Sequence, residues 1–138
     1  MKKNPEKDHH RFYIVESNKK EGFRLKGKIW IEGEGSTFFG MGRAELLEKI
    51  KKYGSISKAA RAMNISYKKA WDLIESMNRQ AKNPLVITKV GGKGGGGAKL
   101  TPEGEEILRQ FKKLYRRFKN FLEKEIKNLN FNLGEKTK

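Results

Sequence analysis

The stretch SISKAARAMNISYKKAWDLIESMNRQA, residues 55–81, decides the fold of this chain. Ser55 can cap a short helix that ends at a turn near Asn64, and Ser66 can cap a second helix that extends to Ala81. In each helix the apolar positions recur at a spacing that puts them on one side. They are Ala59, Ala60 and Met63 in the first helix and Ala70, Leu73, Ile74 and Met77 in the second. Two helices joined by a short turn predict a helix-turn-helix.

A glycine-rich loop follows, between two segments with strand character. Residues 85–90, LVITKV, are rich in β-branched side chains, and residues 98–100 can return beside them. GGKGGGG, residues 91–97, would then be the tip of a hairpin. A hairpin directly after a helix-turn-helix is typical of a winged-helix domain, and glycine lets the backbone of such a wing approach a phosphate chain closely. A solvated hairpin tip with no ligand is the alternative for this loop.

The same loop contains the G-x-G-x-x-G pattern of dinucleotide-binding folds, at Gly92, Gly94 and Gly97. In that fingerprint the glycines open a helix, and an acidic residue follows about 20 positions later, after a second strand. Here the next helix starts only at Pro102, with Thr101 as its cap, and no further strand is expected after it. A Walker loop is excluded as well, because the lysine of the loop is followed by glycine rather than by Ser or Thr.

The segment before the helix-turn-helix predicts a strand region and one more helix. Residues 23–31, FRLKGKIWI, alternate between apolar and polar side chains, so they predict a half-buried strand. This strand could pair with residues 12–15 across a turn at residues 18–22. A helix over residues 42–54 follows, with Gly54 as its stop signal.

A long helix is predicted over residues 102–129, which corresponds to roughly 40 Å at 1.5 Å per residue. That length exceeds what one small domain can cover, so we expect the helix to mediate a homodimer. The apolar positions predicted for dimerisation are Leu108, Phe111, Tyr115, Phe118, Leu122 and Ile126. A basic run over residues 109–119 fits either the outer face of such a dimer or a flank that contacts DNA.

The predicted fold class is therefore mainly α (α+β), a winged helix-turn-helix with an N-terminal strand or hairpin and a long C-terminal dimerisation helix. A disordered arm over residues 1–11 precedes the strand region at residues 12–40. The winged helix-turn-helix spans residues 41–101, and residues 130–138 form a flexible tail after the long helix.

The charge of the chain indicates a polyanionic partner. Lys and Arg total 32 against 16 acidic residues, a net charge of +16 on 138 residues. Residues 55–100 contain nine basic and two acidic residues, the largest excess in the chain. Double-stranded DNA is the first candidate partner and an anionic membrane surface the second. Since no run approaches the ~20 apolar residues of a membrane span, a soluble cytoplasmic protein with no membrane partner is predicted.

The sequence contains no pattern typical of a metal, cofactor or catalytic site. It has no cysteine, which excludes thiolate ligands. His9 and His10 are adjacent in a charged arm, where histidines are more typical of a solvated tail than of a metal site. No paired carboxylates are predicted to frame a cleft. We therefore expect no metal, no cofactor and no enzymatic activity.

The helix-turn-helix prediction assigns DNA contacts to particular side chains. In this motif the start of the second helix meets base edges in the major groove. Those residues are Ser66, Tyr67, Lys68 and Lys69. Lys58 and Arg61 of the first helix would anchor the DNA backbone. The wing would add phosphate contacts through Lys89, Gly92, Lys93, Gly94, Gly95 and Lys99. Trp71 is expected to fill the seam between the second helix and the wing, and the alternative is that it faces DNA.

Four motifs in order, SISKAA, ISYKKAWDLI, the glycine loop and LTPEG, resemble the N-terminal DNA-binding domain of the ModE family of molybdate-dependent bacterial transcriptional regulators. The resemblance covers about residues 42–129, and the SISKAARAMNIS portion is also similar to LysR-type regulators. It implies a winged helix, a homodimer, and operator binding by the helix that begins at Ser66 and by the wing at residues 91–97. ModE regulators carry C-terminal molybdate-binding modules, whereas this sequence stops at Lys138, so no molybdate site is expected in these residues.

The predicted function is that of a DNA-binding transcriptional regulator acting as a homodimer on a two-fold operator. The alternative is a protein that binds nucleic acid or coats the chromosome without reading sequence. A separate effector-sensing protein is left open as a partner. The two readings differ in one measurable property, which is the preference for a selected duplex over a random one.

Overall fold

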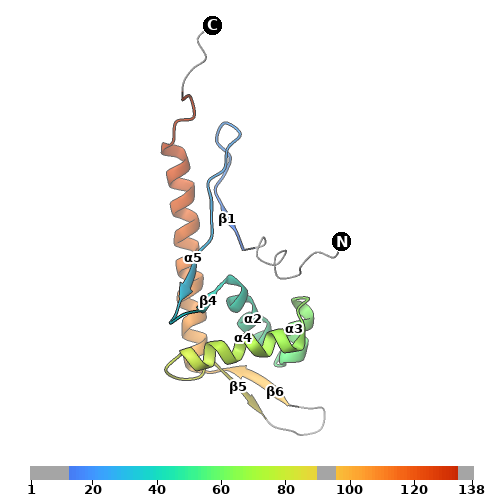
Figure 1. Cartoon of the computed structure of the whole chain (residues 1–138). Coiled ribbons are helices and arrows are strands. Elements are labelled where there is room, and N and C mark those ends of the chain that lie inside the picture. The colour runs from blue at the N-terminus through green and yellow to red at the C-terminus, as the bar shows by residue number, and fades with distance from the viewer. Residues whose placement is uncertain (1–12, 90–95, 134–138) are drawn as a thin grey trace.

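The computed structural model of the chain describes residues 13–89 and 96–133 (Figure 1). Four strands come first, namely β1 (Val15–Glu16), β2 (Lys26–Gly27), β3 (Trp30–Glu32) and β4 (Thr37–Gly40). Three helices, the hairpin and the long helix follow, as α2 (Met41–Tyr53), α3 (Ile56–Ala62), α4 (Tyr67–Gln80), β5 (Val86–Lys89), β6 (Gly97–Leu100) and α5 (Pro102–Asn128). In this part of the chain the strands form three antiparallel pairs, β1–β2, β3–β4 and β5–β6. The α+β fold class and the winged helix-turn-helix are thereby confirmed.

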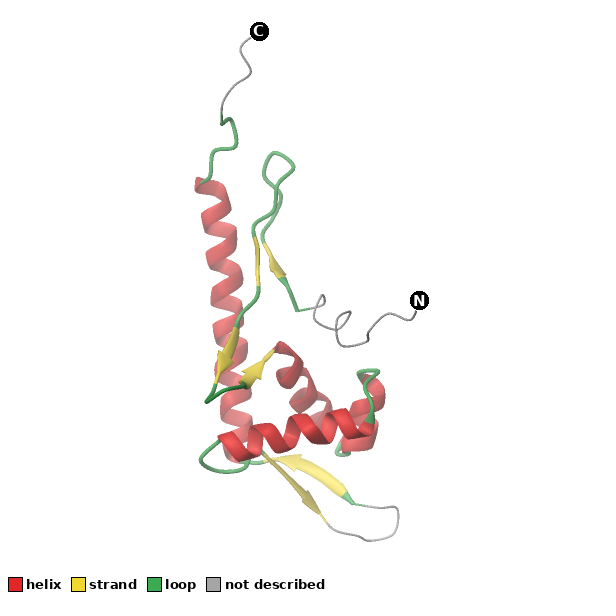
Figure 2. Ribbon diagram, in the orientation of Figure 1, coloured by secondary structure: helices red, strands yellow, loops and turns green. Residues whose placement is uncertain are grey.

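Helices α2, α3 and α4 form a body from which α5 projects, and the β1–β2 hairpin runs beside the projecting part of α5 (Figures 1 and 2). The β5–β6 hairpin leaves the body at the opposite end (Figure 2). The chain thus has a helical body with a wing at one end and a long, thin extension at the other.

One hydrophobic core joins the helix-turn-helix to the first half of α5. Phe39 of β4 is fully buried and meets Phe111 of α5 edge to face, with ring centroids 5.3 Å apart. The other large side chains that are fully buried in this core come from α2 and α4, and they are Leu46, Leu47, Ile50, Ile74 and Met77. The core therefore continues beyond residue 101 into the helix that the sequence assigned to dimerisation.

Local signals in the sequence explain where the helices start and stop. Gly54 has φ +65° and its N–H donates to the carbonyl of Ile50 at 2.7 Å, which ends α2. Thr101 accepts from the N–H of Gly104 at 3.0 Å and caps α5, and Pro102 fits the first helical position. A Cβ on Gly104 would lie 2.2 Å from the carbonyl oxygen of Leu85, so this position lets α5 start against the base of the wing.

The predicted strand over residues 23–31 is interrupted in the structure. Its first half supplies β2, which pairs with β1 in the register Val15 to Gly27, and its second half supplies β3, which pairs with β4. Phe23 was expected to face inward, but its side chain is 54 % exposed and stacks on Phe131 at 4.4 Å. The segment therefore pairs with two different strands, first with β1 and then with β4.

Four of the six residues predicted for dimerisation are buried within their own chain. Leu108 and Phe111 belong to the core, and Leu122 and Ile126 are 4 % and 3 % exposed in the part of α5 that the β1–β2 hairpin accompanies. Tyr115 and Phe118 are half-buried. The dimerisation role assigned to the four buried residues is therefore revised, because the chain itself covers them. The exposed large apolar side chains of this segment are Leu114, Phe121 and Leu129.

Candidate nucleic-acid interface

Two serine caps and one left-handed residue set the geometry of the helix-turn-helix. Ser55 Oγ accepts from the N–H of Lys58 at 3.1 Å, and Ser66 Oγ accepts from the N–H of Lys69 at 2.9 Å. Between the helices Asn64 has φ +59°, a conformation that asparagine tolerates better than most residues. The N–H of Ile65 donates to the carbonyl of Ala60 at 3.1 Å. The turn predicted near Asn64 is thus held by its own backbone and by the cap of α4.

The β5–β6 hairpin is attached to the helix-turn-helix at both strands. Asn78 of α4 accepts from the N–H of Leu85 at 2.8 Å and donates to the carbonyl of Val86 at 3.0 Å. On the other strand the N–H of Ala98 donates to the carbonyl of Gly54 at 3.0 Å. These hydrogen bonds fix the position of the base of the hairpin relative to the helices.

A groove with a volume of about 310 Å³ separates the hairpin from the helices. One wall is the start of α3 with Ser55 and Ser57, and the other is the hairpin with Thr88 and Lys89. Aromatic side chains of α4 line it, since Tyr67 and Trp71 meet edge to face at 6.2 Å between ring centroids. Trp71 is half-buried against the core, so it occupies the seam as its position in the sequence predicted.

Of the described cations predicted to contact DNA, Lys89 lines this groove, and all but one of the others are exposed on the elements that form its walls. Lys58 and Arg61 are exposed on α3, and Lys89 and Lys99 are exposed on the hairpin strands. Lys68 is exposed on α4 and pairs with Asp72 at 3.0 Å. Because both partners are solvated, this pair contributes little and leaves the ammonium accessible. Gly92, Lys93, Gly94 and Gly95 lie outside the described residues.

The exception is Lys69, which lies on a different face of α4 from Lys68. It is half-buried and, with Leu73 one turn later, lines a second pocket on the other side of the helix. The 100° rotation per residue of an α-helix separates two neighbouring lysines in this way. Sequence reasoning grouped them because they are adjacent. The i,i+4 spacing of Lys69 with Leu73 was the signal that could have separated them.

Asn78 is a residue whose importance sequence reasoning missed. It looked like an ordinary polar residue near the end of α4, but both its amide atoms bind the backbone of β5. The signal available in the sequence was weak, since a polar residue at this helix position is usually solvated.

The described residues contain no group of three or more His, Cys, Asp or Glu side chains that could hold a metal ion. The prediction about His9 and His10 concerns residues outside the described part. Among the described helices, none is long and apolar enough to cross a membrane.

Comparison with known proteins identifies this region. Residues 41–105 match the family described as bacterial regulatory helix-turn-helix protein, lysR family. The chain is 36 % identical over 107 residues to the molybdenum transport protein ModE of Azotobacter vinelandii. The matched residues make up 78 % of this chain and 40 % of that relative. It is 46 % identical over 69 residues to the DNA-binding transcriptional dual regulator ModE of Escherichia coli K12. The matched residues make up 50 % of this chain and 26 % of that protein.

A third relative is the molybdenum-pterin-binding protein MopB of Rhodobacter capsulatus, 49 % identical over 69 residues, or 50 % of this chain and 26 % of that protein. The chain thus matches between 26 % and 40 % of the length of these relatives. The family description and the names of the ModE regulators are those of DNA-binding regulatory proteins, which is the class that the sequence predicts. Residues 41–105 are therefore similar to the helix-turn-helix of the lysR family, and the chain is similar to ModE proteins over part of their length.

Proposed function

We propose that the chain binds a two-fold operator as a homodimer, with α4 in the major groove and the β5–β6 hairpin as a wing on the adjacent phosphates. The observation that carries the proposal is a set of exposed cations on α3, α4 and the hairpin strands, the elements that line one groove. These elements come from separate segments of the chain, and the fold brings them together around the groove.

The start of α4 is suited to read bases. Tyr67 is 55 % exposed and Lys68 extends into solvent at the same end of the helix. A lysine can donate to guanine O6 and N7, and the aromatic ring of Tyr67 can contact a thymine methyl group or a phosphate. Exchange of the solvated Asp72 partner for DNA costs Lys68 little. We therefore assign sequence preference to Tyr67 and Lys68.

Phosphate anchoring falls to Lys58 and Arg61 on one side of the groove and to Lys89 and Lys99 on the other. All four are exposed, and none of them pairs with a carboxylate within the described residues. Such contacts carry no sequence information but supply most of the salt-dependent affinity. The glycines of the wing tip would add backbone contacts, as the sequence predicts.

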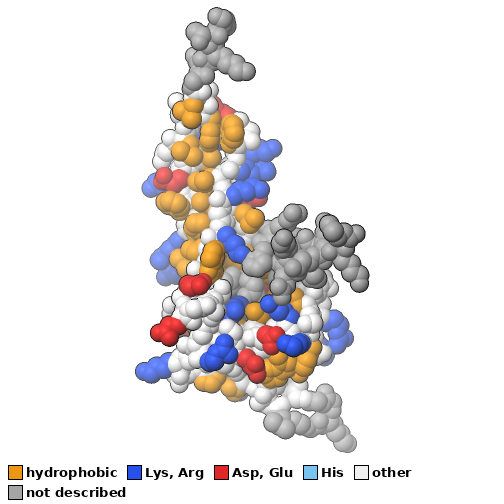
Figure 3. All heavy atoms as spheres, viewed as in Figure 1, with side chains coloured by type: hydrophobic (Ala, Val, Ile, Leu, Met, Phe, Trp, Pro, Cys, Tyr) orange, Lys and Arg blue, Asp and Glu red, His pale blue; other side chains and the backbone are white. Residues whose placement is uncertain are grey.

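Dimerisation is proposed through the exposed apolar positions of α5 rather than through its buried ones. Leu114 and Phe121 are seven residues apart, and they are 37 % and 55 % exposed. Hydrophobic side chains continue along the part of α5 that projects from the helical body (Figure 3). An exposed apolar stripe of this kind typically marks an interface, and two-fold symmetry of the protein would match a two-fold operator with half-sites about one helical turn apart.

The proposed activity places the protein in the cytoplasm, where bacterial DNA is accessible. Effector sensing by a separate protein remains compatible with this proposal. The ModE names of the relatives suggest molybdenum-related control, but no residue of this chain is assigned to it.

In vitro selection of bound duplexes, followed by fluorescence anisotropy across a salt series, tests the proposal. A selected duplex should bind at least ~100-fold more tightly than a random one, and affinity should fall steeply with salt. Lys58→Ala with Arg61→Ala should weaken binding to all duplexes, whereas Lys68→Ala should reduce the preference for the selected one. Lys124→Ala, an exposed lysine on the projecting part of α5, is the matched control.

Equal affinity for random and selected duplexes would favour the alternative function, binding without sequence preference. A flat salt profile would argue against both functions, because phosphate contacts release counterions.

A further inference from the structure

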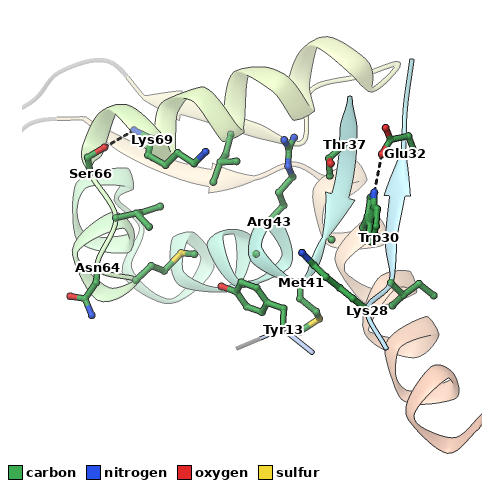
Figure 4. Close-up of a pocket in the computed structure, with 16 residues that line it drawn as sticks. Tyr13, Lys28, Trp30, Glu32, Thr37, Met41, Arg43, Asn64, Ser66 and Lys69 are labelled. Atoms are coloured by element: carbon green, nitrogen blue, oxygen red, sulfur yellow. Dashed lines mark hydrogen bonds between the residues drawn. The ribbon is translucent and has the colours of Figure 1, made fainter. Parts of the chain in front are cut away.

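A pocket of about 700 Å³ lies on the other side of α4 from the proposed DNA face, and it has no role in the proposed function. Its walls come from β3 and β4, from the start of α2, and from the turn of the helix-turn-helix with the first half of α4 (Figure 4). The volume falls within the range of roughly 300–1,000 Å³ that is usual for small-molecule sites.

The lining of this pocket is apolar with a few convergent polar groups. Its apolar surface comes from side chains that pack against the core and are partly buried, namely Ile29, Met41, Ile65 and Leu73, and from the exposed Trp30. Three cationic side chains, Lys28, Arg43 and Lys69, point into the space from different walls (Figure 4). An apolar wall with several cations favours a ligand that has an apolar body and a negative charge.

Arg43 is the central cation of the pocket. Its guanidinium is held by Ser76 Oγ at 2.9 Å and by the carbonyl of Phe38 at 3.4 Å, both of which are neutral acceptors. No carboxylate pairs with it among the residues described. Burial, together with the nearby charge of Arg79, lowers the pKa of Arg43 from its usual value. A half-buried arginine in this setting lacks a counter-charge that an anion would supply.

The acidic groups near the pocket do not supply that charge. Glu32, which lines the pocket, accepts from Trp30 Nε1 at 2.8 Å at its rim (Figure 4). Glu45 accepts a hydrogen bond from the Tyr13 hydroxyl, and burial followed by this bond raises the pKa of Tyr13 well above its usual range. Tyr13 is thus a neutral hydroxyl at the pocket edge. Among the described residues, the pocket lining contains the cations Lys28, Arg43 and Lys69 and one carboxylate, Glu32.

We infer that this pocket binds a small organic anion, with an apolar body against Trp30, Met41 and Leu73 and a carboxylate-type group between Arg43 and Lys28. The site also touches the motif that positions α4, because Asn64, Ile65 and Ser66 form one of its walls. Occupancy would therefore bear on the turn before α4 and on the cap of that helix. We therefore expect the bound anion to change the affinity for DNA. This effect on DNA binding rests on the proposed function, whereas binding of the anion to the pocket does not.

The test of binding uses the full chain without DNA. The fluorescent probe 8-anilinonaphthalene-1-sulfonate should bind saturably at one site per chain. The carboxylate 1-naphthoate should displace it, whereas neutral 1-naphthalenemethanol and inorganic phosphate at the same concentration should not. Lys28→Gln and Arg43→Gln should each weaken probe binding about tenfold, which corresponds to about 1.4 kcal/mol. Lys124→Gln, far along α5, is the matched charge control.

Two further variants keep the test decisive. Since Arg43 also binds Ser76, the Arg43→Gln protein is used only if its circular dichroism spectrum and melting curve are native, and exposed Lys28 carries the test otherwise. Phe121→Glu should leave probe binding unchanged, because Phe121 lies on the exposed stripe of α5 and does not line the pocket. Loss of probe binding in that variant would assign the probe to α5 and overturn the inference.

Other outcomes also overturn the site. If phosphate displaced the probe as well as 1-naphthoate does, the site would not require an apolar body in its ligand. If the neutral alcohol displaced the probe as well, the site would not require a negative charge. Probe binding that falls as the protein is concentrated would show that a second copy of the chain covers the pocket.

The coupling is measured last, with the selected duplex. Saturating 1-naphthoate should change duplex affinity at least fivefold in the unmodified chain but not in Lys28→Gln. If the duplex affinity is unchanged by 1-naphthoate while the probe still binds, the coupling to DNA binding is overturned but the proposed anion site is not. Absence of duplex binding at any 1-naphthoate concentration would instead count against the proposed function.

Discussion

The two halves of α5 have the same amphipathic pattern but different surroundings. The first half, with Leu108 and Phe111, packs into the core of the helix-turn-helix body. Ion pairs to α2 accompany it, from Lys51 to Glu105 at 3.1 Å and from Lys112 to Glu48 at 2.8 Å. The second half projects beyond the body and is accompanied only by the narrow β1–β2 hairpin within the described residues (Figure 1). The same spacing of apolar residues therefore packs against the main core in the first half of α5, whereas in the second half it lies beside a two-stranded hairpin.

This difference suggests that the first half belongs to the stability of the domain and the second half to association. The hairpin is tied to the second half at a few points. Phe118 packs on Gly27, where an added Cβ would lie 2.8 Å from the ring, and Lys119 Nζ donates to the carbonyl of Glu16 at 3.3 Å. Such a thin layer gives less cooperative support than a core.

Phe111→Ala is expected to have the largest effect. It removes a fully buried ring that meets Phe39 and should lower the free energy of unfolding by about 3–5 kcal/mol. Urea denaturation followed by circular dichroism measures this loss. A loss below about 1 kcal/mol would mean that the first half of α5 is not part of the core.

Ile126→Ala should have a smaller and more local effect. The side chain is 3 % exposed, but it lies outside the main core, so we expect a loss of about 2–3 kcal/mol in the free energy of unfolding. Hydrogen exchange should become faster in the β1–β2 hairpin while α4 keeps its protection. Uniformly faster exchange over both segments would show that the two halves unfold as one unit.

Phe121→Glu tests the association of the second half. The ring is 55 % exposed, so the stability of the single chain should hardly change. The proposed dimer should dissociate at least ~tenfold more readily, a change of ~1.4 kcal/mol, in analytical ultracentrifugation. Asn120→Glu adds the same charge at the neighbouring exposed position and should have little effect. A monomer in the unmodified chain at all concentrations would contradict the proposed interface.

Lys20→Met should have the smallest effect. The Lys20 ammonium donates to the carbonyl of Lys127 at 2.7 Å and to that of Leu129, so it caps the end of α5 from the hairpin tip. A cation at a helix C-terminus contributes about 0.3–1 kcal/mol, and that amount should be lost. Lys19→Met, at an exposed neighbour, is the control in the same thermal melt. An equal loss in both variants would assign the effect to general charge and not to the cap.

Sequence reasoning predicted the helix-turn-helix and the hairpin because the signals there are local. Caps at Ser55, Ser66 and Thr101, the stop at Gly54 and the apolar periodicity all act within a few residues of the structure they specify. The groove between the hairpin and the helices could be anticipated for the same reason. Most of the described cations assigned to DNA contact are exposed on the elements that form its walls, and their role in DNA contact stays a prediction.

Two parts of the site could not be predicted. The pocket behind α4 is assembled from β3, β4, the start of α2 and the turn at Asn64, which are distant in the sequence. The orientation of Lys69 toward this pocket follows from the rotation of α4 on the core, because neighbouring helix residues point about 100° apart. The i,i+4 spacing of Lys69 with Leu73 indicates that these two side chains share a face of α4, but only the packing of the helix shows that this face borders a pocket.

The sequence by itself determined the helices, their caps, the hairpin and the excess of positive charge. Tertiary structure alone decided which apolar residues of α5 are covered by their own chain and which are left exposed. The physical reason is that a helical repeat fixes which residues share a stripe, but not what covers it. Leu122 and Ile126 are buried in the part of α5 that runs beside the β1–β2 hairpin, a segment about 100 residues earlier in the chain, and no local pattern specifies that neighbour.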